Sequence, residues 1–139
     1  MAPEQAERIA IESDADVVTA RQRARALAVG LEMPSTDQTL LATAISEIAR
    51  NITAYAVRGE VEIEVVRDTD GRQGVRVIAT DDGPGIEDLE KALTDGYTTG
   101  GGLGLGLPGA RRLVDDFDIQ TAPGEGTKVT LVKWTRASV

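Results

Sequence analysis

The sequence predicts an α/β fold, a two-layer sandwich in which helices cover one face of a mixed, mostly antiparallel sheet. Two observations predict it. Apolar residues recur at helical spacing over residues 16–31 and 36–56. Short segments of alternating apolar and polar residues, typical of strands with one buried face, lie before and after these helices. At 139 residues the chain fits one domain, spanning 1–139.

A strand and then a helix are predicted near the N-terminus. The segment Arg8 to Glu12 alternates apolar and polar residues, and Ser13 and Asp14 offer N-cap oxygens to a helix over about residues 16–31. Three arginines, at positions 21, 23 and 25, mostly lie off the apolar stripe of this helix. We expect a solvated face here, with contact to a partner protein as the alternative.

A second helix and a hairpin are predicted next. Ser35 stands three residues before Gln38, which is the spacing of a capping box. Asp70-Gly71 is a hairpin signal between two alternating segments. The predicted elements of this part are a helix over about 36–56, a strand over 61–65 and a returning strand over 75–80.

The C-terminal half is predicted to contain helices and two closing strands. Pro108 is tolerated in a first helical turn, so a helix can begin at the glycine-rich run that precedes it. Glycines in the segment 122–126 indicate a turn. The predicted elements are a helix over 87–94, a loop over 95–102, a helix over 105–117, and strands over 118–121 and 128–134.

Composition excludes several function classes. The chain has no Cys and no His, so disulfides, thiolate or imidazole zinc sites and Ser-His-Asp catalysis are excluded. A net charge of -8 and few aromatic residues argue against a nucleic-acid partner. No apolar run reaches the roughly 18 to 20 residues of a membrane span, and the N-terminus lacks signal-peptide features. We therefore expect a cytoplasmic protein without a membrane partner.

Two polar residues interrupt the apolar second helix. Glu47 and Asn51 are four residues apart, so they project from one helix face. An Asn carbonyl oxygen is a hard ligand suited to Mg²⁺, and a Glu carboxylate can deprotonate an attacking hydroxyl. The alternative is a surface ion pair between Glu47 and Arg50.

An acidic glycine cluster follows the strand over 75–80. Asp81, Gly83 and Gly85 form an Asp-x-Gly-x-Gly pattern, with Ile86 next to it. A carboxylate there can accept a hydrogen bond from an exocyclic amine such as that of adenine, while glycines let the backbone pass close to a flat base. The alternative is a turn that binds nothing.

A second glycine cluster is predicted to hold phosphate. It contains a literal G-x-G-x-x-G, but loop residues precede it where a dinucleotide fold needs a strand, and no Gly-Lys-Ser/Thr of a Walker P-loop is present. Glycines before a helix N-terminus expose N–H groups and partial positive charge to phosphate, whereas the alternative is a flexible hinge. The candidate residues are Gly100, Gly101, Gly102, Leu103, Gly104, Leu105 and Gly106. Thr127, after the Gly124-Glu125-Gly126 turn, can complete a nucleotide pocket or serve only as a strand residue.

The order and spacing of these motifs resemble those of the GHKL ATPase superfamily. Nearly the full chain is covered, and the runs 46–52 and 95–109 are similar to those of the switch serine/threonine kinases of the bacterial stressosome, in the anti-sigma factor kinase family. The residues that match its N-box, its two glycine boxes and its closing Gly-Thr are Glu47, Asn51, Asp81, Gly83, Gly85, Gly102, Gly104, Gly106 and Thr127.

The resemblance implies a Bergerat-type α/β sandwich and dependence on ATP with Mg²⁺. It implies Glu47 as general base, Asn51 as the Mg²⁺ ligand, Asp81 as the adenine reader and the glycines as phosphate cradle and lid hinge. It also implies phosphorylation of Ser or Thr on STAS-domain proteins of the RsbS and RsbR type, and activation of an RsbU-type phosphatase by the released kinase.

Two other functions stay open from the sequence. One is an anti-sigma factor kinase of the RsbW or SpoIIAB kind, which also sequesters a sigma factor. The other is a binding module that changes partners with ATP but performs no chemistry. A detached histidine-kinase domain is disfavoured, because no His is present as acceptor.

Overall fold

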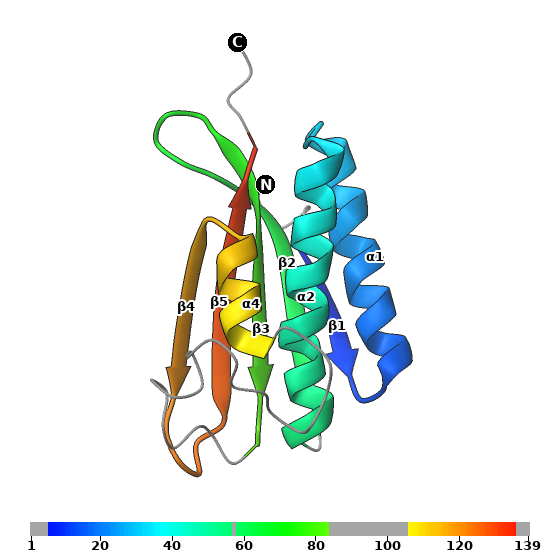
Figure 1. The fold of residues 1–139 in the computed structure, drawn as a ribbon, viewed down its shortest axis with the longest axis vertical. Helices are drawn as coiled ribbons and strands as arrows, with labels where there is room; N and C mark the ends of the chain where they lie inside the picture. The colour runs from blue at the N-terminus through cyan, green and yellow to red at the C-terminus, as the bar shows by residue number, and fades with distance from the viewer. Residues whose placement is uncertain (1–5, 57, 84–105, 136–139) are drawn as a thin grey trace.

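The computed structural model describes residues 6–56, 58–83 and 106–135. Its helices lie together on one face of a single sheet (Figure 1), which confirms the predicted two-layer α/β sandwich. In chain order the elements are β1 (Glu7–Ile11), α1 (Asp14–Gly30), α2 (Ser35–Tyr55), β2 (Gly59–Arg67), β3 (Gln73–Asp81), α4 (Gly106–Leu113), β4 (Asp116–Thr121) and β5 (Thr127–Trp134).

The sheet has five strands in the order β1-β2-β3-β5-β4. All pairings between the described strands are antiparallel, so the parallel component allowed by the sequence-based prediction is not found among them. Residues at matched register positions share a face of the sheet. One such row, which faces the helices, is Ile9, Val61, Ala79, Val129 and Ile119.

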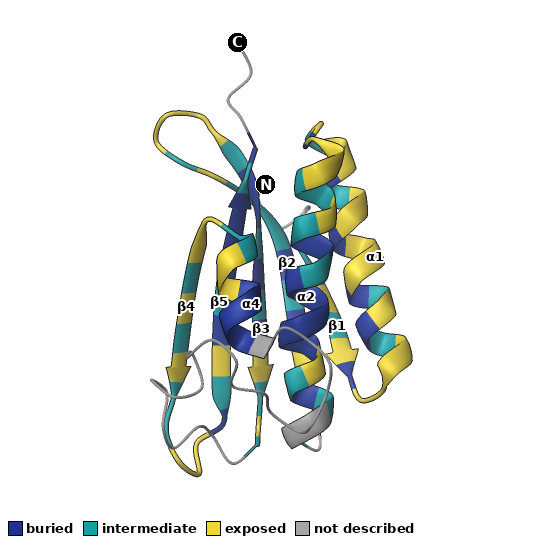
Figure 2. Cartoon of the chain, in the orientation of Figure 1, coloured by how far each residue is buried: buried dark blue, intermediate teal, exposed yellow. Residues whose placement is uncertain are grey.

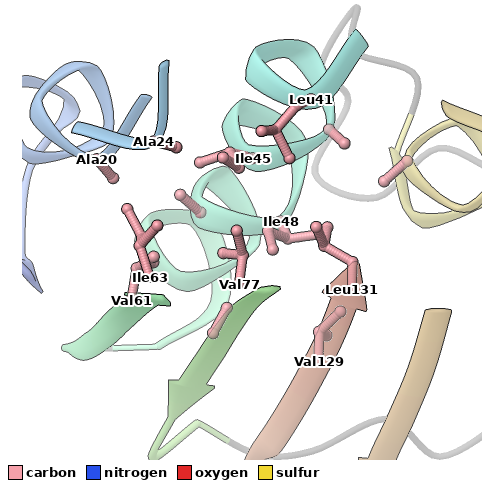
Figure 3. Packing of buried hydrophobic residues seen from close by; sticks show 14 of the residues in the cluster. Ala20, Ala24, Leu41, Ile45, Ile48, Val61, Ile63, Val77, Val129 and Leu131 are labelled. Carbon is pink, nitrogen blue, oxygen red and sulfur yellow. The ribbon is translucent and has the colours of Figure 1, made fainter. Parts of the chain in front are cut away.

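The core lies between α2 and the middle of the sheet. Ile45, Ile48 and Ile52 are almost completely buried, and each contributes about 1.5–3 kcal/mol on burial. Figure 3 shows α2 side chains reaching toward strand residues while α1 approaches from the side with small alanines. Small residues on α1 let the two helix backbones approach closely. Because α2 contacts α1, α4 and the sheet, much of it is buried (Figure 2).

At the start of the first helix, the Asp16 side chain accepts hydrogen bonds from backbone N–H groups that precede the helix. Ser13 is the N-cap, and the Asp16 carboxylate accepts hydrogen bonds from the Ser13 N–H (3.1 Å) and the Glu12 N–H (2.9 Å). Ser13 is therefore the N-cap, as predicted, whereas Asp14 is already the first helical residue, so the helix begins two residues earlier than predicted. The outer face is exposed, as predicted, and Arg23 pairs there with Glu7 at 2.6 Å.

The predicted capping box of the second helix is wrong. The N-cap is Pro34, with φ -55° and ψ 146°, and Ser35 already belongs to α2. The Gln38 side chain turns back and donates to the Met33 carbonyl at 2.8 Å. Proline has no N–H to be satisfied and a fixed φ, which suits the entrance of a helix.

The predicted helix over 105–117 is correct at its start and wrong at its end. It ends at Leu113, and β4 begins at Asp116. The Asp115 N–H donates to the Val132 carbonyl at 3.0 Å, and the Asp115 carboxylate accepts the Trp134 N–H at 2.7 Å. These bonds to β5 draw the chain into the sheet, where Phe117 pairs with Leu131 and packs against the core.

Two predicted elements cannot be compared with the structure. The helix over 87–94 and the loop over 95–102 lie outside the described residues. None of the helices in the described ranges combines the length and the apolar character needed to cross a bilayer.

Candidate active site

The second helix carries the two predicted polar residues beside its buried stripe. Glu47 and Asn51 each precede a core isoleucine, Ile48 or Ile52, so they lie about 100° round the helix from it. Glu47 is only 8 % exposed, and Asn51 is half-buried. Burial of an acidic residue is costly unless the group is paired or used, which marks Glu47 as unusual for a helix surface.

Glu47 forms the ion pair that was the alternative reading of this motif. Arg50 Nη1 donates to Glu47 Oε2 at 3.1 Å, and the Arg50 side chain is 53 % exposed. The two partners therefore differ in burial: the Glu47 carboxylate is buried, whereas the Arg50 guanidinium is largely exposed to water. A surface pair of this spacing contributes roughly 0.3–0.5 kcal/mol.

Asp81 occupies the last position of β3, as predicted. Its Oδ1 accepts the Gly83 N–H at 2.9 Å, and the carboxylate also accepts the Thr127 N–H. Burial raises the pKa of Asp81, the neighbouring Asp82 charge adds to the rise, and the two N–H donors oppose it without cancelling it. Asp81 is therefore a half-buried hydrogen-bond acceptor, and its burial disfavours the ionised form of the carboxyl group.

Gly59 brings the end of α2 and the end of β3 together. A Cβ added at Gly59 would lie 2.8 Å from Ile52 Cγ2, 2.4 Å from the Thr80 carbonyl oxygen and 3.1 Å from Asp81 Cβ. Only a glycine lets the helix and the strand approach this closely. The residue after Asn51 and the carboxyl-bearing Asp81 thus lie on either side of one glycine, so the two halves of the predicted site meet.

The turn before β5 completes this end of the sheet. Gly126 is buried with φ 76°, and a Cβ there would lie 2.2 Å from the Asp81 carbonyl oxygen. Thr127 pairs with Asp81 in the sheet, and its Oγ1 lies 3.0 Å from Oγ1 of Thr121 at the end of β4. Asp81, Gly126 and Thr127 therefore form one packed unit.

Of the second glycine cluster, residues 100–106, the structure describes only Gly106. Gly106 is the first residue of α4, so the cluster does end at a helix N-terminus. That terminus carries the partial positive charge and free N–H groups that bind phosphate. The predicted contacts at Gly85, Ile86, Gly100, Gly101, Gly102, Leu103, Gly104 and Leu105 lie outside the described residues.

The elements that carry the described candidates converge at one end of the sandwich. In Figure 1 the C-terminal end of α2, the end of β3 and the start of β5 lie at the lower end, and α4 begins toward it. An acceptor at the sheet end, oxygen ligands on a helix and a helix N-terminus together suit a base, a metal-bound phosphate and a phosphate chain.

The donor set of α2 fits a magnesium ion shared with phosphates. Within the described part of the chain the Asn51 side-chain amide makes no hydrogen bond, and no cluster of three or more acidic residues suited to a metal is found there. Mg²⁺ is bound in phosphate sites through one or two protein oxygens, with waters and phosphates completing the shell. Asn51 is the residue that would hold it.

Sequence reasoning missed three residues of this site. Gly59 and Thr121 had no predicted role in the site, and Gly126 was predicted only as part of a turn, although all three contact Asp81 or Thr127. A glycine at the start of a strand and a threonine at the end of another are common, so only the pairing of β2, β4 and β5 around β3 reveals them.

Replacing Asp81 with Asn is expected to separate stability from ligand binding. Because the folded-state pKa of Asp81 is raised, the native protein holds this proton more tightly than the unfolded chain. Stability from this group is therefore present at low pH and lost as pH rises from about 3.8 through the folded-state pKa. The Asp81→Asn variant should lack this loss, so its stability relative to the parent should rise across that window, and urea unfolding at pH 4 and pH 7 measures it.

The same Asp81→Asn variant should bind ATP at least about tenfold more weakly by calorimetry, since a hydrogen bond to a charged acceptor contributes about 1.5–3 kcal/mol. Asp82→Asn, which neutralises the exposed neighbouring residue, is the control and should bind ATP like the parent. Unchanged ATP affinity in Asp81→Asn would remove Asp81 from the site.

Comparison with known proteins agrees with this geometry. Residues 36–137 match the family of histidine kinase-, DNA gyrase B-, and HSP90-like ATPases. The chain is 47% identical over 128 residues to the serine/threonine-protein kinase RsbT of Bacillus subtilis, covering 92% of this chain and 96% of that protein. It is 30% identical over 95 residues to the anti-sigma F factor of Caldanaerobacter subterraneus, covering 66% of each.

Solved structures give the same fold. The crystal structure of the RsbU and RsbW domains of Rv1364c from Mycobacterium tuberculosis is similar with a TM-score of 0.60 at 22% identity. That match covers 95% of this chain and 34% of the other, so this chain spans about a third of that polypeptide. The mycobacterial sensor histidine kinase MprB is similar with a TM-score of 0.54 at 20% identity, covering 73% of this chain and 74% of that one.

The family match spans most of the chain, and the kinase relative matches almost end to end, so the resemblance seen in the motifs is confirmed. The chain belongs to the histidine kinase-, DNA gyrase B- and HSP90-like (GHKL) ATPases, and within them it is an ATP-dependent protein kinase of the serine/threonine-protein kinase RsbT group.

Proposed function

We propose that this protein transfers the γ-phosphoryl group of ATP to Ser or Thr of STAS-domain proteins of the RsbS and RsbR type, and that the released kinase activates an RsbU-type phosphatase in the cytoplasm. The observation that carries the catalytic part is the nearly buried Glu47 one helical turn from Asn51. The 47% identity to RsbT supports the choice of partners.

The chemistry assigned to the residues is mostly positioning. Glu47 accepts the proton of the acceptor hydroxyl as that oxygen attacks the γ-phosphorus, the bond from the γ-phosphorus to the bridging oxygen breaks, and ADP leaves. Arg50 is the ion-pair partner of the Glu47 carboxylate. Asp81 and Thr127 orient the base, and the glycines from 100 to 106 are expected to hold the phosphates. Mg²⁺ supplies charge neutralisation at the phosphates when bound, and Asn51 would hold it.

A labelling experiment tests the transfer. The protein is incubated with γ-labelled ATP, magnesium and a purified STAS-domain protein in which the candidate Ser or Thr is present or replaced by Ala. We expect label only on the intact STAS protein, at a slow turnover. ATP binding without any labelling would favour the binding module that performs no chemistry.

The Asn51→Ala variant tests the magnesium ligand. The variant should bind ATP at least about tenfold more weakly than the parent with magnesium present, because a metal ligand is lost. With EDTA the two proteins should bind ATP equally, and Thr53→Ala, two residues along the same helix, should behave like the parent. Equal affinities in the presence of magnesium would show that Asn51 holds no metal.

A second candidate function is an anti-sigma factor kinase. The 30% identity to an anti-sigma F factor favours it, as do two arginines at positions 21 and 25 on an exposed face of α1. Co-purification with a sigma factor decides between the two functions, and the RsbT-like assignment expects none.

A further inference from the structure

A lysine lies buried under the helices, at the end of the sheet remote from the candidate active site. Lys133 is 9 % exposed, and two neighbours on the same face of the sheet, its register partner Val75 and Leu131, are completely buried. It follows Thr127 by six residues, which is about 20 Å along a strand. Lysine is rarely buried to this extent unless its charge is paired.

Two carboxylates from different parts of the chain flank the Lys133 ammonium. Its Nζ lies 3.8 Å from Oδ1 of Asp37, in the first turn of α2, and 4.0 Å from Oδ1 of Asp115, two residues after the end of α4. These two oxygens are therefore within about 8 Å of each other, which does not exceed the Debye length of about 8–10 Å. Without the ammonium between them, the carboxylates would repel each other.

Asp115 is firmly attached to β5 on both sides of Lys133. Its N–H donates to the Val132 carbonyl at 3.0 Å, and its Oδ2 accepts the Trp134 N–H at 2.7 Å. The carboxylate that meets Lys133 thus belongs to the segment that ends α4. Because α4 has only eight residues, about 12 Å of helix, a displacement at this end carries the whole helix with it.

The other ends of these contacts lead to the candidate active site. Figure 1 shows α4 beside the middle of α2, with the two helices running in opposite directions. Glu47 lies about 15 Å along α2 from Asp37, and the N-terminus of α4 lies about 12 Å from its C-terminal end. The first N–H groups of α4 and the turn of α2 that carries Glu47 and Asn51 are therefore set by one relation, the position of α4 along α2.

We propose that Lys133 is a positioning residue for the ATP phosphates: by holding Asp37 and Asp115 together, it fixes the N-terminus of α4 relative to Glu47 and Asn51. A small misplacement of groups that hold a reacting phosphate is costly, whereas the adenine end of the site depends on β3 and β5. This inference rests on the proposed function, in which α4 and Asn51 hold the phosphates and their metal.

The first test compares a ligand that has phosphates with one that has none. Lys133→Met keeps most of the side-chain volume and removes the ammonium. Affinity for ATP with magnesium, measured by calorimetry, should fall at least about fivefold, because α4 is no longer held at its place along α2. Affinity for adenosine, measured by NMR titration, should stay within about twofold of the parent value.

A double variant tests whether charge is the cause. In the parent, Asp37 attracts Lys133, so Asp37→Asn alone should lower ATP affinity about twofold to threefold. In the Lys133→Met background the Asp37 charge only repels Asp115, so adding Asp37→Asn should raise ATP affinity. The effect of one substitution thus changes sign with the presence of the ammonium. If Lys133→Met does not fold, Asp37→Asn alone carries the comparison of ATP with adenosine.

The matched control removes another cation from the sheet. Arg76→Met breaks the ion pair between Arg76 and Glu64 on the opposite face, one residue from Val75, and should leave both affinities unchanged.

The outcomes separate this proposal from the proposed function. Equal losses of ATP and adenosine affinity in Lys133→Met would show a general structural role and overturn the proposal, as would unchanged ATP affinity. A further fall in ATP affinity when Asp37→Asn is added to Lys133→Met would overturn the charge bridge. Failure of the parent to bind ATP with magnesium would overturn the proposed function itself.

Discussion

Replacing Glu47 with Gln should lower phosphoryl transfer to a STAS partner at least about 100-fold while ATP affinity stays within about threefold of the parent value. A positioned general base contributes about 10²–10⁴-fold to rate, and Gln cannot accept the proton. Glu47 is nearly buried and held by Arg50 at 3.1 Å, so an isosteric amide preserves the packing of α2. Transfer rate from γ-labelled ATP and ATP affinity by calorimetry measure the two quantities.

The control for Glu47 is its ion-pair partner. Arg50→Gln removes the guanidinium and keeps the carboxylate, and because Arg50 is mostly exposed its contribution is less than about 1 kcal/mol. Transfer by this variant should fall less than about fivefold. Parent-like transfer by Glu47→Gln would exclude Glu47 as the base, and loss of ATP binding in that variant would assign it to the binding site instead.

Replacing Gly126 with Ala should lower the free energy of unfolding by at least about 3 kcal/mol and lower ATP affinity at least about tenfold. The residue has φ 76°, and the added Cβ would lie 2.2 Å from the Asp81 carbonyl oxygen. Backbone cannot yield as a flexible side chain does, so the end of β3 must shift and carry the Asp81 carboxylate with it. Urea unfolding and calorimetry measure the two effects.

The same turn provides a matched control. Gly124 has φ 79°, close to that of Gly126, but a Cβ there would have nothing within 4 Å. Gly124→Ala therefore tests backbone strain without the collision and should cost about 1 kcal/mol with ATP affinity unchanged. Equal losses in the two variants would mean that strain alone explains Gly126 and that Asp81 is not positioned by it.

Most of the fold could be predicted because the chain is locally consistent. The stripe of Ile45, Ile48 and Ile52 specifies one buried helix face, and the alternation in β2 specifies one buried sheet face. One error arose where a local signal competed with a distant partner. Phe117 continues a helical pattern in the sequence, but it lies in β4 because residues of β5, far along the chain, pair with that segment.

The candidate site was predicted from residue type and order, and its described members lie toward one end of the sandwich. Glu47, Asn51, Asp81 and Thr127 were recognised because a carboxylate, an amide oxygen and glycine turns are what a metal-bound triphosphate needs. Contacts between distant segments were not predicted. Lys133 lies buried on the helix-facing side of β5, and its Nζ is 3.8 Å from Oδ1 of Asp37 at the start of α2. No local sequence pattern predicts that contact.

The sequence by itself determined most of the helices and strands, which face of each is apolar, and which residues have the chemistry to bind nucleotide, because these depend on neighbours within one or two turns of chain. The tertiary structure decided that Gly59 and Gly126 lie close against Asp81 and that the Thr121 and Thr127 hydroxyls form a hydrogen bond. Those contacts join β2, β3, β4 and β5 across the sheet. They depend on strand order and register, which are set when distant segments pair and bury a common core.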